Sequence, residues 1–366
     1  MSVIDSALAQ VKRLHPYTPG KPVEELEREL GIANAIKLAS NENPLGCSDQ
    51  AKQAIETACR NIELYPDANA FYLKHRLAQK LAVDTSQITI GNGSNDVLDL
   101  LARSFLDSNA EAIYSEHAFL VYALIVQACG AKARVAKPLS QNAAQAYGHD
   151  LNAMFNLIGK KTRVIFIANP NNPTGTWVGR AELKEFIDRV PDHIAIIVDE
   201  AYFEYVDEDD YPDTLQWLAE YPNLIITRTF SKIYGLAGLR VGYAISSAEV
   251  SDLLNRVRQP FNANSLALAA ATASLGDEEF VRSSIGNNKI GLQQLMDYFD
   301  SRNISYIPSV ANFLTVNFAN RGDEIYQGLL RQGVIVRPVE NYNLPGYLRI
   351  TIGTPEQQRV LMEKLD

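Results

Sequence analysis

The fold is first indicated by the stretch RVIFIANPNNPTG, residues 163–175, in which an apolar run ends abruptly in a polar, proline-rich loop. The run is continuous rather than alternating, which is typical of a strand buried on both faces of a sheet. Similar runs occur at 88–90, 112–114, 195–198, 224–227 and 241–245, and helical periodicity fills intervals such as 96–105 and 180–190. This alternation predicts an α/β fold with a mostly parallel central sheet between helices.

The pattern changes after Pro260. Residues 266–275 and 277–303 have helical spacing, and shorter strands are predicted at 313–317, 334–337 and 347–352. Fewer strands after a helix-rich start indicate a smaller α+β unit. We therefore expect a large domain over residues 42–259, and a second unit that combines the N-terminal segment 1–41 with residues 260–366.

The N-terminal segment itself predicts two helices. Apolar residues from Val3 to Leu14 recur at helical spacing, and a second amphipathic stretch begins after Pro22 and stops at Gly31. Between them, the sequence His15-Pro-Tyr-Thr-Pro-Gly20 predicts an irregular connection.

Composition excludes several classes of protein. The 366 residues carry a formal charge of −9, which does not favour a nucleic-acid surface. No run of 18 apolar residues predicts a membrane helix, and the first ten residues lack the basic region of a signal peptide. The cysteines are widely spaced without a CxxC pair, which is typical of a reduced, cytoplasmic protein. No histidines stand at i,i+4, so we expect no catalytic metal.

Polar or glycine-rich clusters directly follow four of the predicted strands. They lie at 91–96, 169–175, 199–202 and 229–232. Ligands of open α/β sheets bind at the carboxyl ends of the strands, so these clusters are expected to form one site.

Each cluster suggests a chemistry and leaves an alternative open. The loop 169–175 is made rigid by its two prolines and could hold an asparagine amide against a ligand oxygen, or it could be a structural turn. Residues 91–96 lead into a helix with Ser94 or Asn95 as N-cap, and its free amides suit an anion, although a plain capped helix explains them too. Asp199 ends a buried strand and requires a partner, which could be a cationic heterocycle nitrogen; a salt bridge or a helix cap is the alternative. Lys232, among small residues, is expected to be desolvated and nucleophilic unless it extends to the surface.

The combination of these motifs is more specific than any of its parts. Asn-Pro-Thr-Gly at 172–175, Asp-x-x-Tyr at 199–202, Ser-Lys at 231–232, Arg240 and a late arginine occur in this order. The set resembles the fold type I, class I/II aminotransferases, which use pyridoxal 5′-phosphate (PLP), and the resemblance covers nearly the whole chain. Within that family, the segments 15–20, 65–67 and 348–354 are most similar to the histidinol-phosphate aminotransferases.

The resemblance implies roles for individual residues. Lys232 would form the imine with PLP and transfer the proton, and Asp199 would pair with the pyridine nitrogen. Asn172 and Tyr202 would hydrogen-bond the ring hydroxyl, and Phe119 would stack on the ring. The phosphate would be held by Ser94, Asn95, Thr229, Ser231 and Arg240, and by Tyr65 of the other subunit of a homodimer.

The substrate's anionic end would be bound by Arg349, assisted by Arg337 and Tyr17. Two arginines and a tyrosine exceed what a carboxylate requires, which favours a phosphate ester. For Arg337, a surface salt bridge stays the alternative. The resemblance thus implies transfer of an amino group between histidinol phosphate and 2-oxoglutarate, with glutamate as the other product, in histidine biosynthesis. An aromatic amino-acid aminotransferase, a threonine-phosphate decarboxylase and a non-catalytic ligand-binding protein on the same fold are the alternatives.

Overall fold

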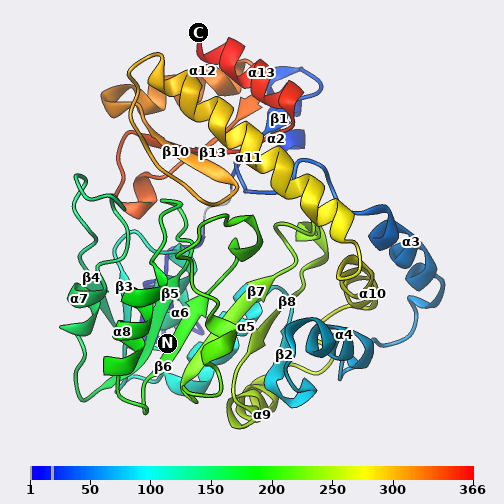
Figure 1. Ribbon diagram of the computed structural model, residues 1–366, viewed down its shortest axis with the longest axis vertical. Helices are drawn as coiled ribbons and strands as arrows, with labels where there is room; N and C mark the ends of the chain where they lie inside the picture. Colours follow the sequence, from blue (N-terminus) through cyan, green and yellow to red (C-terminus); the bar gives the residue numbers. More distant parts are fainter. Residues whose placement is uncertain (1, 18–19) are drawn as a thin grey trace.

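The computed structural model describes residues 2–17 and 20–366, so Thr18 and Pro19 of the 15–20 segment lie outside the described residues. Its main feature is a mixed sheet with the strand order β2-β8-β7-β6-β5-β3-β4, which fills the lower part of Figure 1. The strands are β2 (Ile88–Gly91), β3 (Glu111–Ser115), β4 (Lys132–Ala136), β5 (Thr162–Ala168), β6 (Ala195–Asp199), β7 (Leu224–Thr229) and β8 (Gly242–Ile245). Only β8 is antiparallel to its neighbours within this sheet, so the predicted, mostly parallel α/β architecture is confirmed.

The direction of β8 matters for the site. Gly242, its first residue, pairs with Gly91 at the end of β2 and with Thr229 at the end of β7. The residues that precede β8 therefore lie at the carboxyl edge of the parallel strands. Strand β4 was not predicted, because it is an edge strand whose polar, partly exposed residues give no apolar run.

Helices cover both faces of the sheet. Apolar side chains alternate along β5, so that Ile165 and Ile167 enter one core and Val164 and Phe166 the other. The first core is closed by α4 (Phe71–Leu81), α7 (Leu151–Phe155), α8 (Arg180–Arg189) and α10 (Ser265–Ser274). The second is closed by α5 (Ser94–Phe105), α6 (Leu120–Ala128) and α9 (Ala248–Val257).

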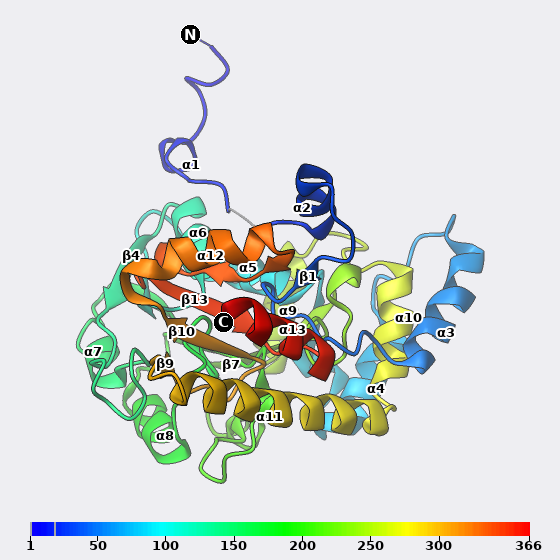
Figure 2. The same ribbon diagram turned by 90° about the horizontal axis from the view of Figure 1, so that it is seen from above.

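A second, antiparallel sheet with the order β12-β13-β10-β9 lies above the first in Figure 1. Its strands are β9 (Tyr306–Ile307), β10 (Phe313–Asn317), β12 (Arg337–Pro338) and β13 (Tyr347–Thr351). It packs with α11 (Glu278–Asp300), α12 (Gly322–Arg331) and α13 (Pro355–Leu365), as Figure 2 shows from above. The predicted strand 334–337 is divided, because β11 (Val334–Ile335) pairs with β1 (Ile36–Lys37) whereas β12 pairs with β13.

The N-terminal segment contradicts one prediction and confirms another. The helix expected over the first 14 residues is reduced to α1 (Ala9–Lys12), and Val3 and Leu8 are exposed. An amphipathic stretch needs a surface against which to bury its apolar side, and in Figure 2 this segment projects from the body of the chain. Helix α2 (Val23–Leu30) forms as predicted, and Gly31 ends it with a φ of +64°.

The division at residues 259/260 stays a prediction. Helix α10, which follows it, packs against α3 (Asp49–Ala58) and joins the core of the large sheet. Within residues 2–17 and 20–366, no helix has the length and apolar character that crossing a membrane would require.

Candidate active site

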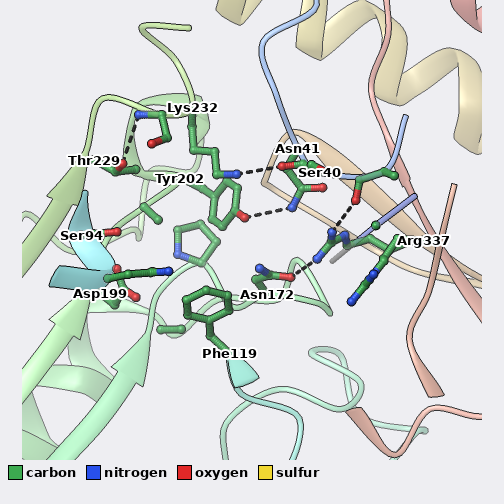
Figure 3. Close-up of a pocket in the computed structure, with 18 of the residues that line it drawn as sticks. Ser40, Asn41, Ser94, Phe119, Asn172, Asp199, Tyr202, Thr229, Lys232 and Arg337 are labelled. Carbon is green, nitrogen blue, oxygen red and sulfur yellow. Dashed lines mark hydrogen bonds between the residues drawn. The ribbon is translucent and has the colours of Figure 1, made fainter. Parts of the chain in front are cut away.

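The carboxyl edge of the large sheet faces the second sheet, and a cavity lies between them (Figure 3). The strands β5, β6 and β7 end at this edge and deliver the residues that follow them. From the other side, β12 and β13 contribute Arg337 and Arg349. The site is thus assembled from segments that are far apart in the sequence.

Asp199, the last residue of β6, is buried at the base of the cavity. Its carboxylate accepts hydrogen bonds from the Tyr122 hydroxyl (2.8 Å) and from the Thr227 hydroxyl (3.0 Å). Burial raises the pKa of Asp199 to about 6, although both hydrogen bonds oppose this shift. The alternative of a helix cap or salt bridge is not realised among the described residues, since the hydrogen-bond partners of Asp199 there are neutral. A cationic group at this position would stabilise the carboxylate.

Lys232 extends into the same cavity after β7. Its Nζ donates to the carbonyl oxygen of Ser40 at 3.0 Å. Desolvation, assisted by the nearby charge of Arg349, lowers the pKa of Lys232 to about 7. Its side chain does not extend to the surface. Near pH 7, the amine is therefore neutral and nucleophilic in a large fraction of the molecules.

A cradle for an anion is formed where β2 meets β8. Gly93 has a φ of +86°, and a Cβ placed on it would lie 2.5 Å from Nη2 of Arg240. The guanidinium of Arg240 therefore lies against the backbone at the start of α5, and it also donates to the Ser231 hydroxyl (3.4 Å). Helix α5 begins at Ser94 with Gly93 as its N-cap, so the prediction of Ser94 or Asn95 at the N-cap was wrong by one or two residues. The free amides of the first turn stay available to an anion.

The opposite wall of the cavity concentrates positive charge. Arg337 and Arg349 are direct partners in the β12–β13 pair, so their side chains leave the same face of the sheet, and both are buried. Arg349 donates to the Ala39 carbonyl at 2.7 Å and to the Asn172 side chain, while its Nε has no partner among the described residues. Tyr17 contacts Arg337, whose guanidinium carbon lies 5.9 Å from the centre of the tyrosine ring. Two buried guanidiniums side by side form a region of positive charge that suits an anion.

Polar side chains also reach the middle of the cavity. The Tyr202 hydroxyl accepts a hydrogen bond from Asn41 at 2.9 Å, and burial raises the pKa of Tyr202 to about 12. Asn172 lies between two cis prolines, Pro170 and Pro173, on the loop after β5. Phe119 lines the cavity at the N-terminus of α6.

All of the predicted site residues but one line this cavity. They are Tyr17, Ser94, Asn95, Phe119, Asn172, Asp199, Tyr202, Thr229, Ser231, Lys232, Arg240, Arg337 and Arg349. Tyr65 does not; it is 82% exposed and stacks on Phe261 with a 4.6 Å separation of ring centres. This position leaves it available to a second chain, as the resemblance requires.

The structure adds contacts that the sequence did not suggest. Tyr122 and Thr227 hold Asp199, and residues 39–41 contact Lys232, Arg349 and Tyr202. One signal was present for Tyr122, which stands one helical turn after Phe119. In the described part of the chain, no three His, Cys, Asp or Glu side chains are grouped as metal ligands.

Comparison with known proteins agrees with this geometry. The family model for aminotransferase class I and II matches residues 33–365. Histidinol-phosphate aminotransferase 2 of Pseudomonas aeruginosa is 53% identical over 98% of this chain and 97% of its own length. Histidinol-phosphate aminotransferase 1 of Idiomarina loihiensis is 51% identical over 97% of this chain and 95% of its own.

A solved structure is similar as a whole. The histidinol-phosphate aminotransferase from Sinorhizobium meliloti, in complex with pyridoxal-5′-phosphate, superposes with a TM-score of 0.88 at 26% identity, covering 99% of this chain and 98% of that one. The match of the family model to most of the chain, together with full-length relatives at about half identity, shows that this chain belongs to the class I and II aminotransferases.

Proposed function

We propose that this chain is a PLP-dependent histidinol-phosphate:2-oxoglutarate aminotransferase. The observation that carries the proposal is that one cavity holds three features: a desolvated amine, a buried carboxylate whose hydrogen-bond partners among the described residues are neutral, and a pair of buried arginines. When bound, PLP stabilises the electron pair that is released at the substrate's α-carbon.

The residues present fit this cofactor at both of its ends. Asp199 lacks a cationic partner among the described residues, and a protonated pyridine nitrogen would supply one. At the other end, Gly93 leaves the space in which Arg240 approaches the first amides of α5, a suitable cradle for a phosphate. Ser94, Asn95, Thr229 and Ser231 line the same region.

The chain's own groups then divide the work. Lys232 Nζ would hold the cofactor covalently, and as a free amine it would take the proton from the substrate's α-carbon. Its pKa of about 7 makes the neutral base abundant at neutral pH. Asp199 would keep the ring nitrogen protonated. Asn172 and Tyr202 would hydrogen-bond the ring hydroxyl, and Phe119 would cover one face of the ring.

The substrate's phosphate is assigned to Arg349, Arg337 and Tyr17. A phosphate ester carries up to two negative charges and has enough oxygens to accept hydrogen bonds from both guanidiniums, which suits it to this pair of arginines. The names of the relatives support histidinol phosphate as the donor.

We also propose that the enzyme works as a cytoplasmic homodimer. Tyr65 is accompanied by Ile62, Leu64 and Tyr72, which are all more than 60% exposed in the single chain. A patch of this kind is typical of an interface, and a second copy would cover it and bring Tyr65 to the partner's phosphate cradle. The thiols of Cys47, Cys59 and Cys129 are unpaired, in keeping with a reducing compartment.

Two measurements test the proposal. The purified protein should show a visible absorption band that borohydride abolishes, and the reduced adduct should map to Lys232. Comparison of kcat/KM for histidinol phosphate, glutamate and phenylalanine then tests the substrate, and carbon dioxide release from threonine phosphate would mark a decarboxylase instead.

Arg337→Ala tests the phosphate assignment directly. Loss of a charge-assisted hydrogen bond, about 1.5–3 kcal/mol, should lower kcat/KM for histidinol phosphate by roughly 10- to 150-fold. Glutamate should be affected less, since its α-carboxylate can still use Arg349. If phenylalanine is the best wild-type substrate, or if Arg337→Ala leaves histidinol phosphate unaffected, the aromatic aminotransferase becomes the better assignment.

A further inference from the structure

The irregular segment 39–43 lies between the two sheets and contacts the site at several points. The Ala39 carbonyl accepts from Arg349, and the Ser40 carbonyl accepts from Lys232. Asn41 follows, almost fully buried and with a φ of +56°, a conformation that asparagine tolerates better than most residues. Nothing in the local sequence marks Asn41 as part of the site, yet its side chain points at Tyr202 (Figure 3).

The carboxamide of Asn41 is oriented by Thr351. The Thr351 hydroxyl accepts from the Asn41 backbone N–H at 2.9 Å and donates its own proton to Asn41 Oδ1 at 3.2 Å. With Oδ1 engaged in this way, Nδ2 faces the other direction and donates to the Tyr202 hydroxyl at 2.9 Å. The Asn41 carbonyl accepts from Asn312 at 3.0 Å, which anchors the backbone independently of the side chain.

This orientation has a consequence for the Tyr202 proton. A phenol carries one proton, and an oxygen that accepts from an amide N–H must direct its own O–H elsewhere. Tyr202 is 3% exposed and lines the cavity, so the direction left to its O–H is into the cavity. An acceptor in place of the amide would take that proton instead.

We propose that Asn41 is a positioning residue, which holds the Tyr202 phenol as a hydrogen-bond donor toward the ring hydroxyl of the bound cofactor. The inference rests on the proposed function, because it assumes that Tyr202 contacts this ring oxygen. Burial raises the pKa of the Tyr202 phenol, and the hydrogen bond from the Asn41 amide opposes this shift. A donor with this effect favours release of the phenol proton toward the cavity.

The same contacts connect Tyr202 with the substrate's arginine. Arg349 and Thr351 are two residues apart on β13, so their side chains share one face of the strand. Thr351 orients the Asn41 amide, while Arg349 donates to the Ala39 carbonyl two residues earlier in the segment. The segment 39–41 therefore fixes the phenol and the guanidinium relative to each other.

The test is a pH titration of the visible absorption of the PLP-loaded enzyme, without substrate. Tyr202→Phe removes the donor from the ring oxygen, which raises the oxygen's affinity for protons, so the midpoint should rise by about one pH unit or more. Asn41→Asp keeps the size of the side chain but can only accept while ionised, and should raise the midpoint in the same direction although the phenol is intact. Asn312→Ala, which loosens the same segment behind Asn41, should lower thermal stability and leave the midpoint unchanged.

A double variant separates the reorientation of the Tyr202 phenol from the electrostatic effect of the new carboxylate at position 41. Asn41→Asp combined with Tyr202→Phe should titrate like Tyr202→Phe alone, because no phenol proton remains to be redirected. The inference is overturned if Asn41→Asp raises the midpoint by the same amount in the wild-type and the Tyr202→Phe backgrounds. It is also overturned if Asn41→Asp alone has the wild-type midpoint. Should Asn41→Asp fail to fold, Asn41→Gly accepts the left-handed backbone and removes the amide, so that the phenol is no longer held in one orientation and the midpoint should rise by less than in Tyr202→Phe; a wild-type midpoint there overturns the inference as well.

The outcomes also distinguish this inference from the proposed function. A protein without a visible band, or a Tyr202→Phe variant with a wild-type midpoint, contradicts the proposed role of Tyr202 itself. A shift in Tyr202→Phe with none in the Asn41 variants contradicts only the positioning role of Asn41.

Discussion

Burial moves the pKa values of Asp199 and Lys232 toward each other, to about 6 and about 7. Because the cavity disfavours charge, the neutral form of each group is more populated near neutral pH than it would be in water. Neither group has an ionic partner among the described residues. A single bound PLP ring would give the carboxylate a protonated nitrogen and the amine a carbon to which it can bond. Two predictions follow from these two residues.

Asp199→Asn should lower kcat by well over about tenfold, equivalent to roughly 1.4 kcal/mol in the activation free energy. The amide oxygen can still accept from one of the Tyr122 and Thr227 hydroxyls while the amide N–H donates to the other, so fold and cofactor binding should largely survive, but the neutral amide cannot keep a ring nitrogen protonated. Steady-state kinetics with histidinol phosphate, alongside the PLP content of the purified variant, makes the measurement. A loss smaller than tenfold in a fully loaded variant would contradict the electronic role.

The capture of PLP by cofactor-free protein should follow the titration of Lys232. With a pKa of about 7 the amine is protonated below that pH and neutral above it, so the rate should rise about tenfold from pH 6 to pH 8 and then level off. Stopped-flow absorbance at the visible band measures this rate. A rate that keeps rising toward pH 10 would indicate an ordinary, solvated lysine, and Lys232→Ala should bind PLP without forming the band.

At the scale of secondary-structure elements, the anion cradle depends on how β2, β8 and α5 meet rather than on one continuous sequence motif. The antiparallel strand β8 brings Arg240 beside the turn between β2 and α5, and Gly93 provides the space for it. The sequence suggested the glycine-rich turn and the arginine separately. That they meet depends on the antiparallel pairing of β8, which a continuous apolar run does not reveal.

Gly93→Ala should therefore weaken PLP binding by about tenfold or more, because the new Cβ would lie 2.5 Å from Arg240 Nη2 and displace it. Gly31→Ala is a control for a positive φ alone: Gly31 has a φ of +64° at the end of α2, with nothing within 4 Å of the added Cβ. Gly93, with a ψ of 164°, has a backbone conformation that is almost restricted to glycine, so Gly93→Ala bears a larger backbone cost, about 1–3 kcal/mol, and its thermal stability is measured beside its PLP affinity. Equilibrium dialysis of PLP compares their affinities, and equal affinities would show that the contact with Arg240 is unimportant.

Residues at strand ends were predictable, whereas those that orient them were not. Asp199 and Lys232 stand out because polar residues interrupt apolar runs at the edge of a sheet. Asn41 and Thr351 are 310 residues apart, and Tyr122 and Asp199 are 77 apart, so no local pattern connects them. The N-terminal helix fails for the opposite reason, since its local pattern is strong but the chain offers it little surface to pack on.

At the scale of the whole molecule, the single chain supplies every predicted site residue except Tyr65. Tyr65 is exposed, as are Ile62, Leu64 and Tyr72, and its ring stacks on Phe261. In the homodimer proposed above, Tyr65 would complete the cavity of the other copy. Two-fold symmetry would then place each Tyr65 in the partner's site.

Hybrid dimers test this arrangement. A Lys232→Ala homodimer should be inactive, and a Tyr65→Ala homodimer strongly impaired through loss of a phosphate contact. In a mixed dimer, one site combines both defects, and the other pairs the intact Lys232 of one chain with the intact Tyr65 of the other. Unfolding and refolding the two variants together should therefore restore activity, to about a quarter of the wild-type level if the chains associate at random. The recovered activity should elute as a dimer in size-exclusion chromatography. If mixing yields no more than the average of the two parent variants, Tyr65 serves its own chain or none, and the shared site is wrong.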